Sequence, residues 1–274
     1  MYGILAYASN YSKPTRGLQY AAEVANIFAS PLTAIFVSEP IVPLSPLGIT
    51  PVPPEIYASV AQVVVEAQAA EPIFARWASS VGLERFRWQV ATGYFSAALT
   101  AAANWHDALV LESGGTMPWN SVGMLGHALI HCGAPCFVVP DRHGKAACFD
   151  TIAIASHGSP ESIRAVQSAL PLLKRAQRIV LIKGTARDAF SPVDFRPVFS
   201  IEEHLRQHGL HFATRVLDAG DTDAGKAILA AASEANADLL VMGAYGRARF
   251  SEWMLGGATR HVLGHAALPV FVRH

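Results

Sequence analysis

The feature that most constrains this chain is an internal repeat. One order of sequence signals occurs twice along its 274 residues: an apolar strand, a short polar loop, a helix, further strands and helices, and a closing strand that begins with proline. The opening strand and helix are residues 4–8 and 15–28 in the first copy, and residues 152–156 and 161–173 in the second. A repeat of this length predicts two copies of one structural unit in tandem.

The late strands of the two copies indicate the fold class. Each is an acidic residue followed by an unbroken apolar run, Asp107-Ala-Leu-Val-Leu and Asp238-Leu-Leu-Val-Met. Strands that are apolar at every position are typical of parallel sheets that are buried on both faces. Because strands alternate with helices, we predict an α/β fold in which each copy is a doubly wound parallel sheet with helices on both sides.

The boundaries of the two copies follow from polarity and proline content. A polar stretch, Asp141 to Ala147, separates a finished strand from a new one, so we place the domains at residues 1–141 and 149–274. The first copy carries a proline-rich insert at residues 39–54, which we expect to be an extended surface excursion. Apolar residues at helical spacing from Ile56 to Val81, Trp77 among them, predict one long helix whose apolar face covers the sheet.

Composition excludes several classes of partner. Lys plus Arg equal Asp plus Glu at 21 each, and neither sign forms a long block, so we expect no nucleic-acid or anionic-membrane surface. The N-terminus has no basic leader, and no run approaches the roughly 18 apolar residues of a membrane span, so we expect a cytoplasmic protein. Cys132, Cys136 and Cys148 form no CxxC pair, and we expect reduced thiols.

The most specific motif follows the late strand of the second copy. It reads Met242-Gly-Ala-Tyr-Gly246, then nine residues, then Gly256-Gly-Ala-Thr259 at the start of a helix. Glycines let a backbone approach a ligand without an intervening Cβ, and free N–H groups at a helix N-terminus suit phosphate oxygens. The motif favours a ligand loop at residues 243–257, beyond the carboxyl ends of the strands, although glycines needed only for the turn would give the same pattern.

This spacing resembles the universal stress protein family, whose nucleotide-binding members carry Gly-x2-Gly-x9-Gly followed by Ser or Thr after their fourth strand. The pattern Gly256-Gly-Ala-Thr-Arg260 looks like the tandem members, and Leu268-Pro-Val-Phe-Val272 is similar to the family's last strand. The resemblance covers both copies. It implies an adenine nucleotide alpha hydrolase-like fold with five parallel strands in the order 3-2-1-4-5 in each domain.

The resemblance also implies the ligand and its contacts. The ligand would be ATP or a related adenine nucleotide, with Mg²⁺ as its companion ion. Glycines would line the ribose and phosphates, a methionine and the first loop would frame the base, and the loop's Tyr and Arg side chains could stack on or pair with the ligand. The nucleotide-binding residues expected in the second domain are His157, Met242, Gly243, Tyr245, Gly246, Arg247, Gly256, Gly257 and Thr259.

Two positions depart from the family pattern. Gly257 stands where the family has a Ser or Thr that donates to phosphate, and Thr259 is a conceivable substitute. His157 stands where the family has an acidic residue near the base and ribose, and the first domain has Ser9 there. A neutral imidazole has one donor and one acceptor, whereas a carboxylate only accepts, so the ligand preference changes with this residue. The first domain's loop, Glu112 to Asn120, lacks the glycine spacing, and we expect no nucleotide there.

The histidine pairs and the segment from Ser156 to Ser159 are expected to have structural roles only. His127 with His131 and His261 with His265 have the i, i+4 spacing of zinc ligands, but no glutamate or third ligand accompanies either pair, so we expect no metal site. Ser156-His157-Gly158-Ser159 has no Gly-x-Ser-x-Gly turn, so we expect no catalytic residues.

Two functions remain open from sequence. The first is a non-enzymatic stress-response protein that binds an adenine nucleotide in its second domain, with slow hydrolysis left open. The second is an interaction module of the same fold that has lost nucleotide binding, pairs its two domains through their last strands and presents the proline-rich insert to a partner. In either case we expect a homodimer or an intramolecular pair of domains, because open sheets have exposed edges.

Overall fold

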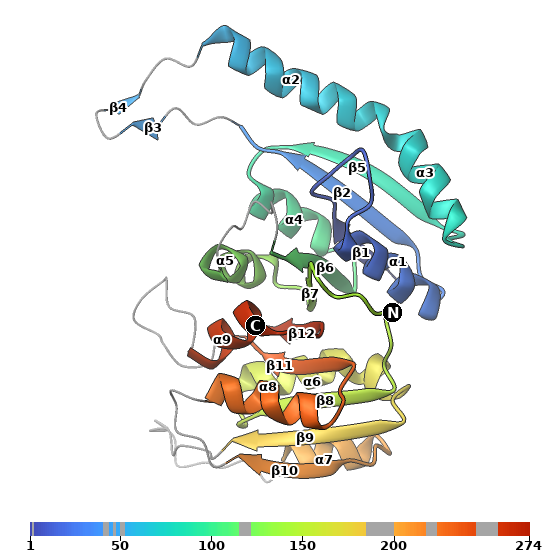
Figure 1. Ribbon diagram of the computed structural model, residues 1–274, viewed down its shortest axis with the longest axis vertical. Helices are drawn as coiled ribbons and strands as arrows, with labels where there is room; N and C mark the ends of the chain where they lie inside the picture. The colour runs from blue at the N-terminus through green and yellow to red at the C-terminus, as the bar shows by residue number, and fades with distance from the viewer. Residues whose placement is uncertain are drawn as a thin grey trace.

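The computed structural model describes residues 1, 3–40, 44–45, 48–49, 53–114, 122–184, 200–217, 224–244 and 257–274. Within these residues one ten-stranded sheet runs the length of the molecule (Figure 1). In spatial order its strands are β10 (Ala213–Leu217), β9 (Arg178–Gly184), β8 (Thr151–Ser156), β11 (Leu239–Gly243), β12 (Val270–Arg273), β7 (Cys136–Pro140), β6 (Ala108–Ser113), β1 (Ile4–Tyr7), β2 (Leu32–Ser38) and β5 (Phe86–Thr92).

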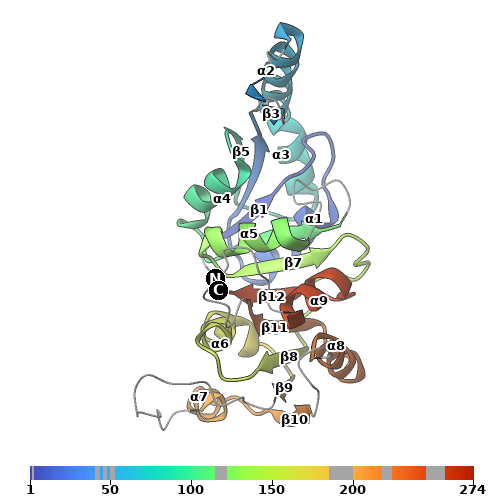
Figure 2. The same cartoon turned by 90° about the vertical axis from the view of Figure 1, so that its left-hand side faces the viewer.

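Each half of the chain contributes five consecutive strands of this sheet in the order 3-2-1-4-5, which confirms the predicted fold class. Neighbouring strands within each half are parallel. The two halves meet where β7 and β12 pair antiparallel, with Phe137 directly opposite Phe271. Figure 2 shows these two strands side by side in the middle of the molecule. The intramolecular pairing of last strands, one of the predicted arrangements, is therefore present.

Helices cover both faces of the sheet. One buried cluster holds residues of α1 (Arg16–Ile27), α3 (Glu71–Ser80), α6 (Pro160–Leu173) and α7 (Ile201–Gln207). The opposite cluster holds residues of α4 (Phe95–Ala103), α5 (Val122–Cys132), α8 (Ala224–Glu234) and α9 (Gly257–His265). Along β8, Ile152 and Ile154 join the first cluster and Ala153 and Ala155 the second. This alternation of faces explains why the strand is apolar at every position.

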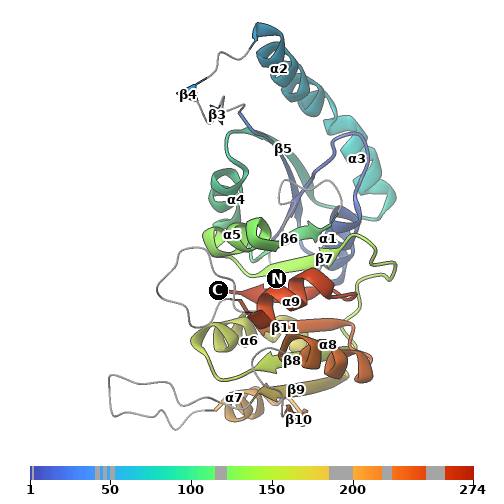
Figure 3. The same cartoon turned by 60° about the vertical axis from the view of Figure 1, so that its left-hand side comes forward.

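The single long helix predicted over residues 56–81 is wrong. The chain forms α2 (Pro54–Ala69) and α3, separated at Ala70, because Pro72 has no N–H to continue the helical hydrogen bonds. On α3, Phe74 and Ala78 are buried and Trp77 packs against the core, as predicted. On α2 only Ala67 is buried, and Figure 3 shows this helix extending beyond the sheet.

The proline-rich insert is described only in part. Its residues include a two-residue pair of antiparallel strands, β3 (Leu44–Ser45) and β4 (Gly48–Ile49), and Pro54 is the first residue of α2. The predicted excursion otherwise lies outside the described residues. No helix in the described part of the chain is long and apolar enough to cross a membrane.

The stretch between the halves is fixed to α1. The Ala147 N–H donates to Glu23 Oε2 at 2.7 Å, and the Arg16 guanidinium bonds both to Glu23, at 3.1 Å, and to the Lys145 carbonyl.

The three cysteines, Cys132, Cys136 and Cys148, are free thiols, and burial raises the pKa of Cys132 to about 11. A thiol with so high a pKa is a poor nucleophile at neutral pH.

Candidate functional site

The switch point of the second half lies between β8 and β11. The chain leaves β8 toward β9 on one side, whereas β11 continues to β12 on the other, so the strand order reverses between them. Open α/β sheets bind ligands beyond the carboxyl ends of their strands at such a point. His157 follows β8 directly, and Met242 and Gly243 end β11, so these three predicted residues lie at this edge of the sheet.

The turn from β8 into α6 is held by its own serines. Ser159 is the N-cap of α6 and accepts a hydrogen bond from the Ser162 N–H at 3.3 Å. The Ser156 and Ser162 hydroxyls are 3.0 Å apart, and the Gly158 N–H donates to Ser156 Oγ at 3.2 Å. These serines are buried structural groups, whereas His157 between them is exposed at the carboxyl edge of the sheet.

Gly243 is a glycine because a helix presses on it. A Cβ at this position would lie 2.5 Å from the Ser162 nitrogen and 2.7 Å from the Glu161 carbonyl carbon, both backbone atoms of the first turn of α6. The glycine therefore brings the end of β11 into contact with a helix N-terminus. Sequence reasoning assigned this glycine to the ligand, but the helix alone is a sufficient reason for it.

Met242 cannot frame a base with its side chain. The residue is only 5% exposed and belongs to the buried cluster beneath α8 and α9. Only its backbone can face the crevice, because successive side chains of a strand point to opposite faces and this one points into the core.

Helix α9 begins at Gly257, at the far end of the predicted ligand loop. Gly257 is exposed, and a Cβ added to it would meet no atom of the described residues within 4 Å. Thr259, the proposed substitute hydroxyl, is 6% exposed in the first turn of the same helix. Tyr245, Gly246, Arg247 and Gly256 lie outside the described residues.

The strand ends of the two halves differ in the ionisable side chains that they carry, which sequence reasoning missed. In the second half His157 follows β8, Lys183 is the last but one residue of β9, and Arg273 ends β12. In the first half Glu39 follows β2, Glu112 is the last but one residue of β6, and Asp141 follows β7. Each of these residues could have been identified by reading the last positions of every predicted strand.

Some of the second half's positive charge is already paired. Lys183 forms an ion pair with Glu202 at the start of α7. Burial of Glu202 opposes ionisation, but the hydrogen bond and charge of Lys183 outweigh it, so the pKa of Glu202 is lowered. Arg273 lies beside α6, with its guanidinium 3.5 Å from Ser168 Oγ.

The histidine pairs have local structural partners. The rings are 4.0 Å apart in His127–His131 and 4.2 Å apart in His261–His265. The His265 Nδ1–H donates to the His261 carbonyl at 2.9 Å, and a Cβ on Gly225 of α8 would lie 2.6 Å from the His261 Cβ. Among the residues that the structure describes, no group of three or more His, Cys, Asp or Glu side chains could hold a metal ion.

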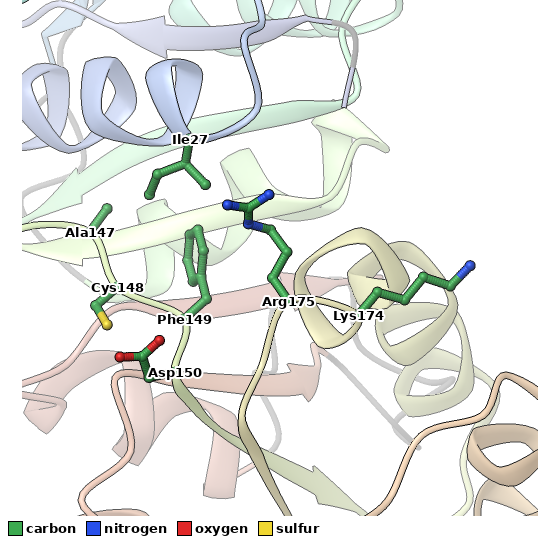
Figure 4. A pocket seen from close by; sticks show the side chains of 7 residues that line it. All are labelled: Ile27, Ala147, Cys148, Phe149, Asp150, Lys174 and Arg175. Atoms are coloured by element: carbon green, nitrogen blue, oxygen red, sulfur yellow. The ribbon is translucent and has the colours of Figure 1, made fainter.

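A cleft of about 470 Å³ lies at the opposite edge of the second half, where the halves meet (Figure 4). It is lined by Ile27, Ala147, Cys148, Phe149, Asp150, Lys174 and Arg175. Arg175 points into the cleft, with its guanidinium 5.5 Å from the centre of the Phe28 ring, whereas Lys174 points away. Because Asp150 precedes β8, this cleft is at the amino end of the strands and is separate from the ligand crevice.

Comparisons with known proteins were made against families, curated proteins and solved structures. Residues 149–274 match the model of the universal stress protein family. A universal stress protein from Archaeoglobus fulgidus DSM 4304 has a similar structure, with a TM-score of 0.66 and 19% sequence identity over 99% of this chain and 95% of that one. A universal stress protein of Pseudomonas aeruginosa UCBPP-PA14, itself assigned provisionally, gives a TM-score of 0.56 and 12% identity over 99% and 92% of the chains.

A functionally unknown protein from Pseudomonas aeruginosa PAO1 has a TM-score of 0.58 and 13% identity over 99% and 92% of the two chains. No curated protein matches the chain. At these identities the solved structures support the two-copy fold along the whole chain and leave the ligand open.

Proposed function

We propose, from the membership of residues 149–274 in the universal stress protein family, that this chain is a tandem stress-response protein that binds an adenine nucleotide in its second domain. The domains are residues 1–141 and 149–274, and the nucleotide acts as a regulatory ligand rather than as the substrate of an enzyme. The nucleotide would lie beyond the carboxyl ends of β8 and β11.

The contact between Gly243 and the first turn of α6 carries the proposal. It places the N-terminus of a 14-residue helix against the strand end at the switch point. The positive end of the α6 dipole attracts phosphate oxygens, whereas its Ser162 N–H is already bound by Ser159 and its first residue, Pro160, has no N–H. Arg273 at the end of β12 adds positive charge nearby, whereas Lys183 is already paired with Glu202.

The proposed contacts divide between the ends of the ligand loop and its middle. His157 would lie near the ribose, Gly243 and the Met242 backbone would border it, and Gly257 and Thr259 would offer the N-terminus of α9 to the phosphates. Tyr245, Gly246, Arg247 and Gly256 complete the proposed site, and Mg²⁺ would accompany a triphosphate.

Calorimetric titration with ATP, ADP and AMP, with and without Mg²⁺, tests this function, together with native mass spectrometry of freshly purified protein. We expect one nucleotide per chain, and we expect Gly246→Val to abolish binding because a branched side chain would enter the phosphate space. Gly144→Val, in the exposed segment between the halves, is the matched control and should bind as wild type does. Absence of binding to the wild type at millimolar ATP would refute the proposal.

An interaction module without nucleotide is the second candidate, and the exposed apolar side chains of α2 favour it. Ile56, Tyr57 and Val65 are 40%, 54% and 58% exposed. Exposed apolar surface of this kind commonly marks a contact with another molecule. Wild-type protein that binds no nucleotide in the titration above would favour this candidate over the first.

A further inference from the structure

The cleft between the halves has a size and a position that suit a small ligand. Its volume of about 470 Å³ lies within the range of small-molecule sites, roughly 300–1,000 Å³, and such sites are common where two units of a protein meet. One wall is the end of α1, in the first half, and the other is the turn after α6, in the second. A ligand in this cleft would therefore touch both halves.

Backbone groups hold the walls of the cleft in place. The Asp150 carbonyl accepts from the Gln177 and Arg178 N–H groups, both at 2.9 Å, which joins the turn after α6 to the segment between the halves. The Ala147 N–H donates to Glu23 of α1 at 2.7 Å, which joins that segment to the other wall. These bonds do not use the side chain of Asp150 or of any other residue that lines the cleft, so the lining can be altered without breaking them.

Arg175 provides a positive charge inside the cleft. Its guanidinium lies 5.5 Å from the centre of the Phe28 ring and forms no ion pair with any residue that the structure describes. Contact with an aromatic face orients the planar guanidinium and leaves its N–H groups for a planar anion such as a carboxylate. Because arginine stays protonated at physiological pH, this wall attracts an anionic group.

Asp150 provides a negative charge in the same cleft. Figure 4 shows its carboxylate beside Cys148, with the Phe149 side chain between it and Arg175. Within the described part of the chain this carboxylate has no cationic partner. An ammonium group on a ligand would pair with it, whereas the multiple negative charges of a phosphate group would be repelled.

The rest of the lining is mainly apolar. Ile27, Ala147 and Phe149 contribute aliphatic and aromatic carbon, and the Phe149 ring centre lies 6.2 Å from that of Phe28. An apolar group of a ligand would lose its contact with water against these side chains, which favours binding. The cleft thus combines one cation, one carboxylate and an apolar surface.

We propose that this cleft binds a free α-amino acid with an apolar side chain. Its carboxylate pairs with Arg175, its ammonium group pairs with Asp150, and its side chain packs against Ile27 and Phe149. The charges of ligand and cleft match one for one, which a nucleotide does not achieve. The site is separate from the proposed nucleotide site and does not rest on the proposed function.

Calorimetric titration of the full chain with L-leucine and L-phenylalanine tests the ligand class. We expect one amino acid per chain. 4-Methylpentanoate lacks the ammonium group of leucine and 3-methylbutylamine lacks its carboxylate, so each should bind at least roughly tenfold more weakly, because a hydrogen bond between charged groups is lost. AMP should not displace leucine. No binding of either amino acid at millimolar concentration, equal binding of 4-methylpentanoate, or displacement by AMP overturns the proposal.

Arg175→Gln and Lys174→Gln form a matched pair, because each removes one positive charge and only Arg175 points into the cleft. We expect leucine to bind at least roughly tenfold more weakly to Arg175→Gln and unchanged to Lys174→Gln. Asp150→Asn keeps the backbone carbonyl that holds the wall, and it should weaken the binding of leucine but not that of 4-methylpentanoate. Equal losses in the two glutamine variants would show a general effect of charge and would refute the site.

Thiol labelling locates the bound amino acid. Cys148 lines the cleft, whereas Cys132 and Cys136 are 2% and 1% exposed, so iodoacetamide should reach Cys148 first. Burial raises the pKa of the Cys148 thiol, so the labelling is measured at alkaline pH by peptide mass spectrometry. We expect leucine to slow the labelling of Cys148 in the wild type and not in Arg175→Gln. Binding without protection of Cys148 places the amino acid elsewhere and overturns the proposal.

ATP titration of Arg175→Gln separates this inference from the proposed function. The variant should bind ATP as the wild type does, because the cleft lies at the amino end of the strands. ATP binding without leucine binding refutes the amino-acid site alone. Leucine binding without ATP binding refutes the proposed function alone. Loss of ATP binding in Arg175→Gln would contradict the separation of the two sites.

Discussion

At the scale of single residues, glycines that look alike in sequence have different causes. Gly243 is required by the backbone of α6, Gly17 makes room for the Glu112 carboxylate, and an added Cβ on Gly257 has no neighbour within 4 Å in the described part of the chain. Of these three glycines, Gly257 alone could be replaced by a larger residue without a clash with the residues that the structure describes. Of the two ends of the motif that the structure describes, Gly243 is therefore a packing position and Gly257 is not, so the two should respond differently to substitution.

Replacing Gly243 by alanine should destabilise the fold by about 1–3 kcal/mol, because the new Cβ overlaps backbone atoms that cannot rotate away. Gly257→Ala is the control and should change the free energy of unfolding by less than about 1 kcal/mol, with a gain expected from helix propensity. Urea denaturation monitored by circular dichroism measures both. Equal stability of the two variants would contradict the assigned contact.

Restoring the family's polar residues should strengthen nucleotide binding. His157→Asp returns an acceptor for the ribose hydroxyls, and Gly257→Ser returns a donor to phosphate in open space. A hydrogen bond contributes about 0.5–1.5 kcal/mol, so each change should lower the Kd for ATP by roughly 2- to 10-fold. Calorimetric titration checks this. Weaker binding of both variants would argue that the ligand is not held in the family's way.

At the scale of elements, the two halves cap equivalent helices differently. Helix α6 uses its own Ser159, whereas α1 uses the distant Glu112 and leaves the Thr15 hydroxyl unpartnered. The break between α2 and α3 is likewise a local effect of Pro72. How much of α2 and α3 is buried depends instead on how far the sheet extends beneath each helix.

The two N-cap residues should therefore differ in importance. Ser159→Ala removes the cap of α6 and should cost about 1 kcal/mol of stability. Thr15→Ala removes a hydroxyl that makes no hydrogen bond and should cost nothing or stabilise slightly. Urea midpoints of the two variants, measured side by side, give the comparison. A larger loss for Thr15→Ala than for Ser159→Ala would overturn the assignment of caps.

At the scale of the whole molecule, the antiparallel pair of β7 and β12 joins two units into one sheet. Phe137 and Phe271 have ring centres 4.8 Å apart in an edge-to-face arrangement, and the buried cluster around them includes residues of both halves. The stretch between the halves is also held by Arg16 and Glu23 of α1. The halves should accordingly unfold together.

Calorimetry tests this coupling. We expect one unfolding transition for the wild type, and a loss of about 3–5 kcal/mol in Phe271→Ala because a fully buried ring at the seam is removed. Val216→Ala on the edge strand β10, where the side chain is 66% exposed, is the control and should change stability by less than about 0.5 kcal/mol. Two resolved transitions in the wild type would show that the halves are independent.

The sequence by itself determined the fold of each half, because strands that are apolar at successive positions, such as Leu239 to Met242, can be satisfied only inside a helix-covered parallel sheet. It also located the crevice, since the order of elements fixes the switch point. Only the tertiary structure showed which contacts single residues make. The roles of Glu112 and Gly243 depend on helices 95 and 81 residues away, and the exposure of α2 depends on where the sheet ends. Such contacts leave no local pattern, because they are set by which surfaces meet after the chain has folded.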